Sequence, residues 1–139
     1  GVVNNHNNLV GMTSIVHDKF SVIISLLNTD LMISAKIKKS GHYGSLTWDG
    51  KLFNKMQLND IPKHANIKIG DTIVTSAYSN IFPEDLYIGT ISEYKTEENT
   101  NFLQISVQLF VDFTNINHVY IIETKLKNER QILEKILIP

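Results

Sequence analysis

The residues with the clearest potential for chemistry lie in the stretch GDTIVTSAYSNIFPEDLYIGTI, residues 70–91. Ser76 could act as a nucleophile if a histidine and a carboxylate met beside it, and His17 with Asp18 could supply that pair. Such a triad, with an oxyanion hole, would make the chain a β-barrel serine-protease-like enzyme. The Gly-Asp pair, however, leads into Thr72-Ile73-Val74 and not into a glycine-flanked serine, and threonine is common in strands. We therefore predict no catalytic residue.

Other polar motifs do not indicate a cofactor. The histidines lack i, i+2 or i, i+4 pairing on a common element, which argues against a metal site. These five histidines are His6, His17, His42, His64 and His118. The sequence GHYG at residues 41–44 lacks the GxxxxGK[ST] pattern of a phosphate loop, and no helical pattern follows it. We predict no metal and no cofactor.

Composition favours a globular domain over a nucleic-acid binder. The chain has 139 residues, no cysteine and a formal net charge of −1, whereas a general nucleic-acid binder carries an excess of Lys and Arg. Tyr43 and Trp48 lie in a lysine-bearing region, so an OB-like oligonucleotide-binding module stays open as an alternative. No apolar run approaches the roughly 18 residues needed to cross a bilayer.

The small net charge hides a marked asymmetry along the chain. Residues 36–68 contain seven lysines and two aspartates, whereas residues 69–112 contain seven acidic residues and a single lysine, Lys95. Two solvated surfaces would explain this pattern, and so would a charge-complementary contact between copies or with a partner.

Hydrophobic periodicity indicates strands over most of the chain. From Leu103 to Val111 apolar residues occupy every second position, which is the period of a half-buried strand. The Asp49-Gly50 pair predicts a type I′ turn between two hairpin arms. We expect further strands over residues 10–16, 21–27, 33–37, 43–48, 52–58, 72–75, 86–91 and 118–122.

About nine short strands without an intervening helical segment predict an all-β fold. These are too few for one large barrel, so we expect two small β-barrel subdomains. Residues 31–92 would form an inserted barrel, and residues 1–30 with 93–122 an outer barrel. Residues 123–139 are rich in helix formers and would form a short C-terminal helix or tail.

The order of several motifs is informative as a set. The chain opens with Gly-Val-Val, continues with a Val-Gly strand at residues 10–11, and reaches a GSLTWDG hairpin at residues 44–50. A GDTIVTS strand then leads through the Phe82-Pro83 turn to an Ile-Gly-Thr strand. Together these motifs, over residues 1–122, resemble the periplasmic β-barrel region of the MreC family of rod shape-determining proteins, in a version closest to those of Bacteroidetes.

The resemblance implies a non-catalytic scaffold of the cell-wall elongation machinery. It implies self-association into dimers or filaments, and partners that include an elongation-specific penicillin-binding transpeptidase, RodA, MreD and MreB. It implies a periplasmic location, with a tether to the inner membrane that this chain, beginning at Gly1, does not contain.

Two positions depart from the family pattern, which usually has glycine there. Ala77-Tyr78 follow the Thr-Ser pair, and Glu84-Asp85 follow the Phe-Pro turn. Because aspartate tolerates left-handed backbone better than most residues, the second turn can be kept. We expect a different loop shape at the first.

Apolar side chains at the centre of a contact and charges around it are the candidates for partner binding or self-association. The apolar candidates lie around the Phe-Pro turn, and the charged ones form a lysine strip. They are Tyr78, Phe82 and Tyr87, with Lys36, Lys38 and Lys39. Core packing for Phe82 and simple solvation for the lysines are the competing interpretations.

Overall fold

The computed structural model describes residues 1–16, 21–79, 81–96, 98–116 and 118–122. These residues form strands and turns and no helix, as the all-β prediction requires. None of them forms a helix long and apolar enough to span a membrane. The helix or tail predicted for residues 123–139 lies outside the described residues.

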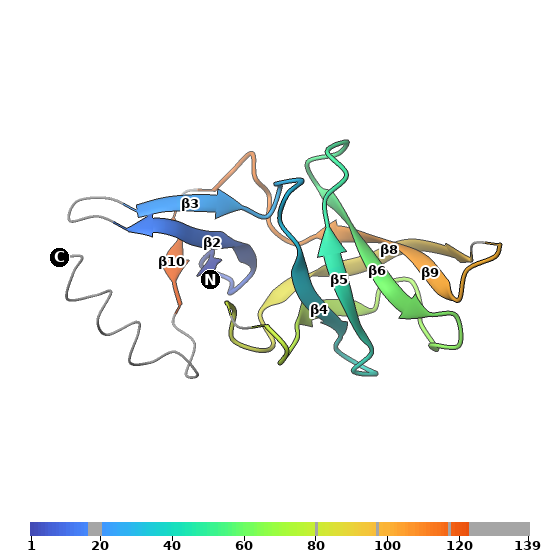
Figure 1. Ribbon diagram of the computed structural model, residues 1–139. Coiled ribbons are helices and arrows are strands. Elements are labelled where there is room, and N and C mark those ends of the chain that lie inside the picture. The colour runs from blue at the N-terminus through green and yellow to red at the C-terminus, as the bar shows by residue number, and fades with distance from the viewer. Residues whose placement is uncertain (17–20, 80, 97, 117, 123–139) are drawn as a thin grey trace.

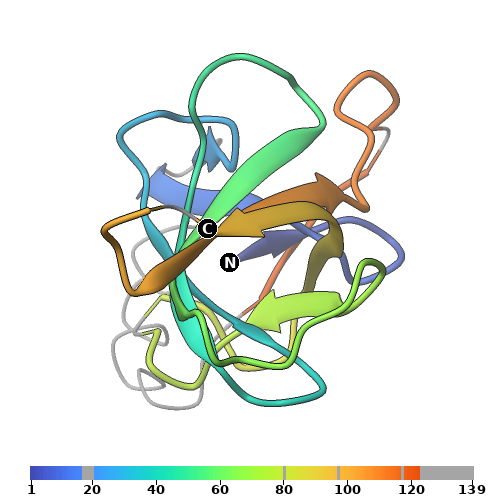
Figure 2. The ribbon, with the colours of Figure 1, turned by 90° about the vertical axis from the view of Figure 1, so that its right-hand side faces the viewer.

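Six strands close into a barrel in the order β4-β5-β6-β9-β8-β7. Figure 2 looks toward this end of the molecule, where the strands of the barrel are arranged in a ring. Their bounds are β4 Ile33–Ile37, β5 Tyr43–Thr47, β6 Lys55–Pro62, β7 Thr72–Thr75, β8 Tyr87–Thr96 and β9 Phe102–Leu109. All neighbouring pairs are antiparallel, and the pairing of β4 with β7 completes the ring.

The barrel interior follows the predicted alternation of side chains. In β9, Leu103, Ile105 and Val107 point inward and are at most 5% exposed. In β4, the buried residues Ile33, Ala35 and Ile37 alternate with outward polar ones. Burying one face of every strand supplies most of the driving force for folding, because apolar area leaves water.

A second sheet of four strands lies beside the barrel in the order β10-β1-β2-β3 (Figure 1). Its strands come from both ends of the described chain. They are β1 Val2–Val3, β2 Leu9–Val16, β3 Ser21–Ser25 and β10 Tyr120–Ile121. The first of these was not among the predicted strands. A parallel bridge between Asn8 and Tyr87 links this region to the barrel.

The predicted boundary after residue 92 is wrong. Strand β8 continues to Thr96, and β9 pairs with both β6 and β8, so the barrel extends to Leu109. Without β9 the ring could not close, because β6 and β8 do not pair with each other. The pattern of residues 102–111 predicted a strand but carried no information about its neighbours.

The predicted type I′ turn at Asp49-Gly50 is also wrong. Strands β5 and β6 do pair, but the connection runs from Trp48 to Asn54. A type I′ turn needs positive φ at both central residues, and here Gly50 has φ 81° whereas Asp49 is not among the positive-φ residues. The indole Nε1 of Trp48 instead donates a hydrogen bond to the Leu52 carbonyl at 2.8 Å, which favours a wider loop.

Candidate functional site

The outward face of β4 is tied to the segment that contains the Phe-Pro turn, residues 76–87. The hydroxyls of Ser34 and Ser76 share a hydrogen bond at 2.6 Å. Lys36 forms ion pairs with Glu84 and Asp85. Lys38, the residue directly after β4, donates from Nζ to the Tyr87 hydroxyl at 2.9 Å. Three successive outward side chains thus hold this segment against the barrel wall.

The predicted lysine strip is therefore largely engaged within the chain. The hydrogen bond to Glu84, then that to Asp85, raises the pKa of Lys36 above its usual value. The hydrogen bond to Tyr87 similarly raises the pKa of Lys38. Of the three lysines, Lys39 alone is exposed without a polar partner among the described residues. Part of the charge asymmetry between the two halves is thus neutralised inside one molecule.

Replacing Lys36 by methionine should lower the free energy of unfolding at pH 7 by about 0.5–1 kcal/mol, the range of partly exposed ion pairs. Since the folded-state pKa lies above 10.5, this stabilisation is complete below that pH and is lost as pH rises through the raised pKa. Urea unfolding of the unmodified chain and of Lys36→Met, at pH 7 and at about pH 11.5, measures the difference in their free energies of unfolding. Lys39→Met is the matched control, and equal losses for both variants would contradict a role for the ion pairs.

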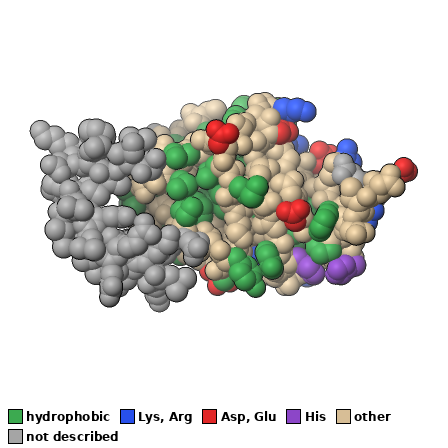
Figure 3. Space-filling model, viewed as in Figure 1, with side chains coloured by type: hydrophobic (Ala, Val, Ile, Leu, Met, Phe, Trp, Pro, Cys, Tyr) green, Lys and Arg blue, Asp and Glu red, His purple; other side chains and the backbone are tan. Residues whose placement is uncertain are grey.

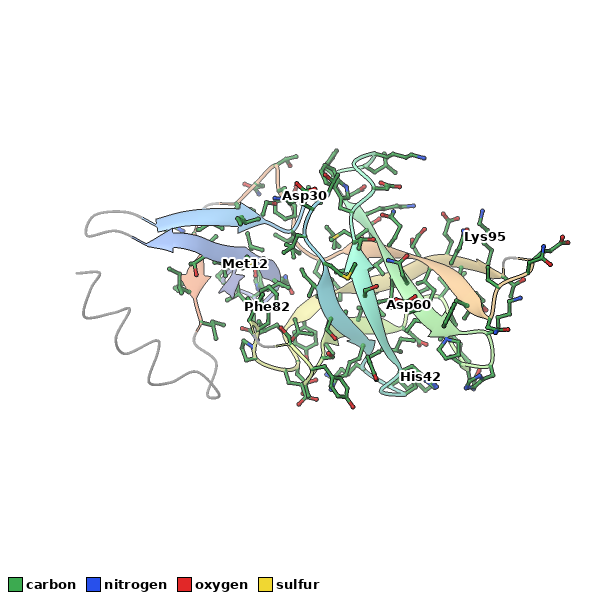
Figure 4. All side chains as sticks on the ribbon, in the orientation of Figure 1. Met12, Asp30, His42, Asp60, Phe82 and Lys95 are labelled. Atoms are coloured by element: carbon green, nitrogen blue, oxygen red, sulfur yellow. The ribbon has the colours of Figure 1, made fainter. Side chains whose placement is uncertain are left out.

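Phe82 is only 3% exposed and is not available to a partner. Figure 4 shows its side chain where the Phe-Pro segment meets the second sheet. A Cβ added to Gly1 would lie 2.8 Å from the Phe82 ring and 3.6 Å from Leu86, so these side chains fill the junction. Core packing, the competing interpretation for Phe82, describes its environment.

The turn after Phe82-Pro83 keeps a left-handed residue although glycine is missing. Asp85 has φ 69°, which confirms that aspartate can take this position. Its backbone N–H donates to the Thr75 carbonyl at 3.0 Å, so the turn is anchored to the end of β7.

Tyr78 forms an exposed aromatic pair with Tyr43, the first residue of β5. The ring centroids are 4.4 Å apart with an interplanar angle of 36°. Tyr78 is 69% exposed and Tyr43 52% exposed, so neither is needed to fill the core. The Tyr78 N–H donates to the Ser76 hydroxyl at 3.2 Å, which holds the start of the loop. Figure 3 shows hydrophobic side chains gathered at the lower edge of the barrel, next to histidines.

Tyr43, one member of this pair, lines a hollow of about 780 Å³ on the outer face of β4, β5 and β6. We call it the tyrosine groove. Its lining consists of Met32, Ser34, Ser40, Gly41, His42, Tyr43, Gly44, Ser45, Asp60 and Pro62. Ser34 and Ser45 have small side chains and form the base of the groove. Tyr43 and Met32, which is 67% exposed, project from its sides. Figure 4 places His42 and Asp60 in this part of the barrel.

The groove combines the apolar surfaces of Met32, Tyr43 and Pro62 with small polar side chains. Ser76 is 1% exposed, and its hydroxyl is bonded to Ser34 and to the Tyr78 N–H, so it is not placed to attack a substrate. The proposed partners of that serine, His17 and Asp18, lie outside the described residues. Within the described residues no group of three or more His, Cys, Asp or Glu could hold a metal ion. The rings of His42 and His64 do approach each other, at 6.1 Å.

Sequence reasoning did not name Met32, and it considered Tyr43 only for the alternative of an oligonucleotide-binding module. Strand alternation could have found them, because the inward positions Ile33 and Leu46 place Met32 and Tyr43 outside. Tyr87, by contrast, is half-buried and is held by Lys38 and by the Phe110 ring at 6.3 Å. Of the predicted aromatic contact residues, Tyr78 is the most exposed.

Residues 1–123 match the family described as Rod shape-determining protein MreC, barrel core. The chain belongs to the MreC family. A curated relative, the cell shape-determining protein MreC of Listeria monocytogenes, is 24% identical over 118 residues. That match covers 83% of this chain and 40% of the relative, so the chain spans less than half the relative's length.

Solved MreC structures have the same fold. The crystal structure of MreC from Pseudomonas aeruginosa matches with a TM-score of 0.77 at 19% identity, over 85% of this chain and 75% of that one. A chain from the complex between Penicillin-Binding Protein (PBP2) and MreC from Helicobacter pylori matches with a TM-score of 0.69 at 21% identity. It covers 86% of this chain and 73% of that chain. The likeness shows that this chain shares the all-β fold of these MreC structures.

Proposed function

We propose that this MreC chain is a non-catalytic periplasmic scaffold of the cell-wall elongation machinery, which maintains rod shape by organising peptidoglycan synthases. The observation that carries the proposal is the exposed Tyr43–Tyr78 pair beside a groove in a closed barrel. Tyrosine is enriched among the residues that dominate binding energy at protein interfaces. Tyr43 lies on the paired strand β5, so its ring loses little conformational freedom on binding.

The partner proposed for the tyrosine groove is a penicillin-binding transpeptidase. An MreC of Helicobacter pylori has been solved in complex with PBP2, which makes this class of enzyme the first candidate. RodA, MreD and MreB are further partners that the family resemblance implies. A tether to the inner membrane would hold the scaffold beside these partners.

The double variant Tyr43→Ala/Tyr78→Ala should bind the cognate transpeptidase at least about tenfold more weakly than the unmodified chain. Both rings are largely exposed. The free energy of unfolding of the double variant should therefore fall by only about 1 kcal/mol, the value of a lost aromatic pair. Biolayer interferometry with the immobilised periplasmic part of the transpeptidase measures the dissociation constant.

Tyr120→Ala is the matched control, because Tyr120 is 56% exposed but lies on β10 in the second sheet. Self-association into dimers or filaments is the other part of the proposed function. It should persist in the double variant if it uses other surfaces. Analytical sedimentation measures the self-association of both proteins. An unchanged dissociation constant in a folded double variant would remove the tyrosine groove as the transpeptidase site.

A further inference from the structure

The tyrosine groove contains a single carboxylate, that of Asp60. Among the described residues that line the groove, Asp60 is the only Asp, Glu, Lys or Arg. It is exposed, and Figure 4 shows it on β6, where this strand runs beside β5. A partner that docks in the groove therefore meets one acidic group.

A β-bulge places Asp60 on the outer face of the barrel. The register of β6 shifts between Leu58 and Ile61, which are both buried. Asn59 and Asp60 therefore both lie between two inward positions, and Asp60 takes φ 69°. Asparagine and glycine suit a left-handed backbone at least as well as aspartate does. The backbone alone thus does not explain why this position carries a charge.

The Asp60 carboxylate is oriented within the chain, but most of its bonding capacity is unused. The Ser45 hydroxyl donates to Asp60 Oδ2 at 3.1 Å, which is the one hydrogen bond of this carboxylate among the described residues. The ion pairs among the described residues involve Lys36 and not Asp60. Because an ionised carboxylate can accept about four hydrogen bonds, Asp60 can still accept a pair of donors.

Tyr43 lies on the same face of the barrel as this carboxylate. Leu46 of β5 is buried, so the alternating positions Ser45 and Tyr43 point outward. Residues two apart on a strand are separated by roughly 7 Å, so the Tyr43 ring is close to the hydroxyl that holds Asp60. A carboxylate and an aromatic ring at this spacing suit a planar cation, which can pair with the first and stack on the second.

We propose that the tyrosine groove recognises an arginine of its docked partner. The guanidinium would donate two hydrogen bonds to the Asp60 carboxylate and lie against the Tyr43 ring. Lysine suits the site less well, because its ammonium has no planar surface to stack. The inference rests on the proposed function, since the partner is the transpeptidase proposed for this groove. It makes Asp60 a specificity-determining residue, which repels a partner with an acidic group at this point.

Asp60→Asn should weaken transpeptidase binding about tenfold, because it removes the charge with which the arginine pairs. Asparagine tolerates the left-handed backbone and its Oδ1 can still accept from Ser45, so the fold should be retained. Biolayer interferometry with the immobilised periplasmic part of the transpeptidase measures the dissociation constants. The dependence of the dissociation constant on salt should also be weaker for the variant. Glu93→Gln is the matched control, because it removes an exposed negative charge on β8, outside the groove.

A second arm of the experiment identifies the partner residue. Each surface arginine and lysine of the transpeptidase fragment is replaced by methionine, and its affinity is measured for the unmodified chain and for Asp60→Asn. We expect one arginine variant to bind both chains equally, because the interaction that Asp60→Asn removes is then already absent. The same arginine variant should reduce the effect of Tyr43→Ala.

Unchanged affinity of Asp60→Asn, or an equal loss for Glu93→Gln, would overturn the proposal. So would a lysine, or no cationic residue at all, as the partner residue that couples to Asp60. If Tyr43→Ala/Tyr78→Ala weakens binding and Asp60→Asn does not, the transpeptidase docks without the arginine and only this inference fails. If neither variant weakens binding, the docking proposal fails and takes this inference with it.

Discussion

Replacing Thr75 by valine should lower the free energy of unfolding by about 2–4 kcal/mol, since two buried backbone groups lose their partner. Thr75 is fully buried at the end of β7. Its hydroxyl donates to the Pro83 carbonyl at 2.6 Å and accepts from the Leu86 N–H at 2.9 Å. Valine has nearly the same shape, so the loss comes from the unpaired carbonyl and N–H rather than from a cavity.

Urea unfolding followed by circular dichroism measures this change. Thr75→Ser keeps the hydroxyl and should cost only about 1 kcal/mol for the lost methyl group. Thr72→Val is the matched control, because the Thr72 hydroxyl makes no hydrogen bond among the described residues and lies at the more exposed end of β7. If Thr75→Val and Thr72→Val were equally stable, the hydroxyl would not be what holds the Phe-Pro turn.

The same variant links stability to binding. The Phe-Pro segment carries Tyr78 at one end and is anchored by Thr75 at the other. We expect Thr75→Val to weaken transpeptidase binding as well, although Thr75 itself is not exposed. Thr75→Ser should retain binding, which separates an effect of the anchor from a general loss of fold.

Gly44→Ala should destabilise the barrel by about 3 kcal/mol or more, because the new side chain has no room. A Cβ at Gly44 would lie 1.9 Å from the Asn59 carbonyl oxygen and 3.3 Å from Ile61 Cδ1. The register of β6 shifts between Leu58 and Ile61, and Asp60 takes φ 69° there. This bulge directs the Asn59 carbonyl toward β5, so only glycine fits opposite it.

Thermal unfolding and near-ultraviolet circular dichroism measure the loss of the closed barrel. Ser45→Ala is the matched control in the next position, because it removes only a hydrogen bond of 3.1 Å to the exposed Asp60 carboxylate. We expect it to change stability by less than about 0.5 kcal/mol. A Gly44→Ala variant as stable as Ser45→Ala would show that the bulge shifts without cost.

The site was only partly predictable. Tyr78 was predicted as a contact residue near the Phe-Pro turn, and the structure leaves it exposed. Its partner Tyr43 lies 35 positions away in sequence, and no local pattern brings the two rings together. Lys36 and Glu84 are similarly distant, so counting charges along the chain could not show that they neutralise each other.

The sequence by itself determined the all-β class, because alternating apolar residues such as Leu103, Ile105 and Val107 can bury one face only as a strand. It also determined that a turn would form after Phe82-Pro83, since proline restricts the backbone and Asp85 tolerates positive φ. These are local properties of the chain.

Only the tertiary structure decided which strands are neighbours. Strand β9 belongs to the barrel because its backbone bonds to β6 and β8, and these bonds join residues far apart in sequence. The same long-range pairing buries Ser76, places Tyr78 on Tyr43, and forms the tyrosine groove. The physical reason is that a strand pattern specifies a buried face but leaves both backbone edges able to pair with any partner of suitable register.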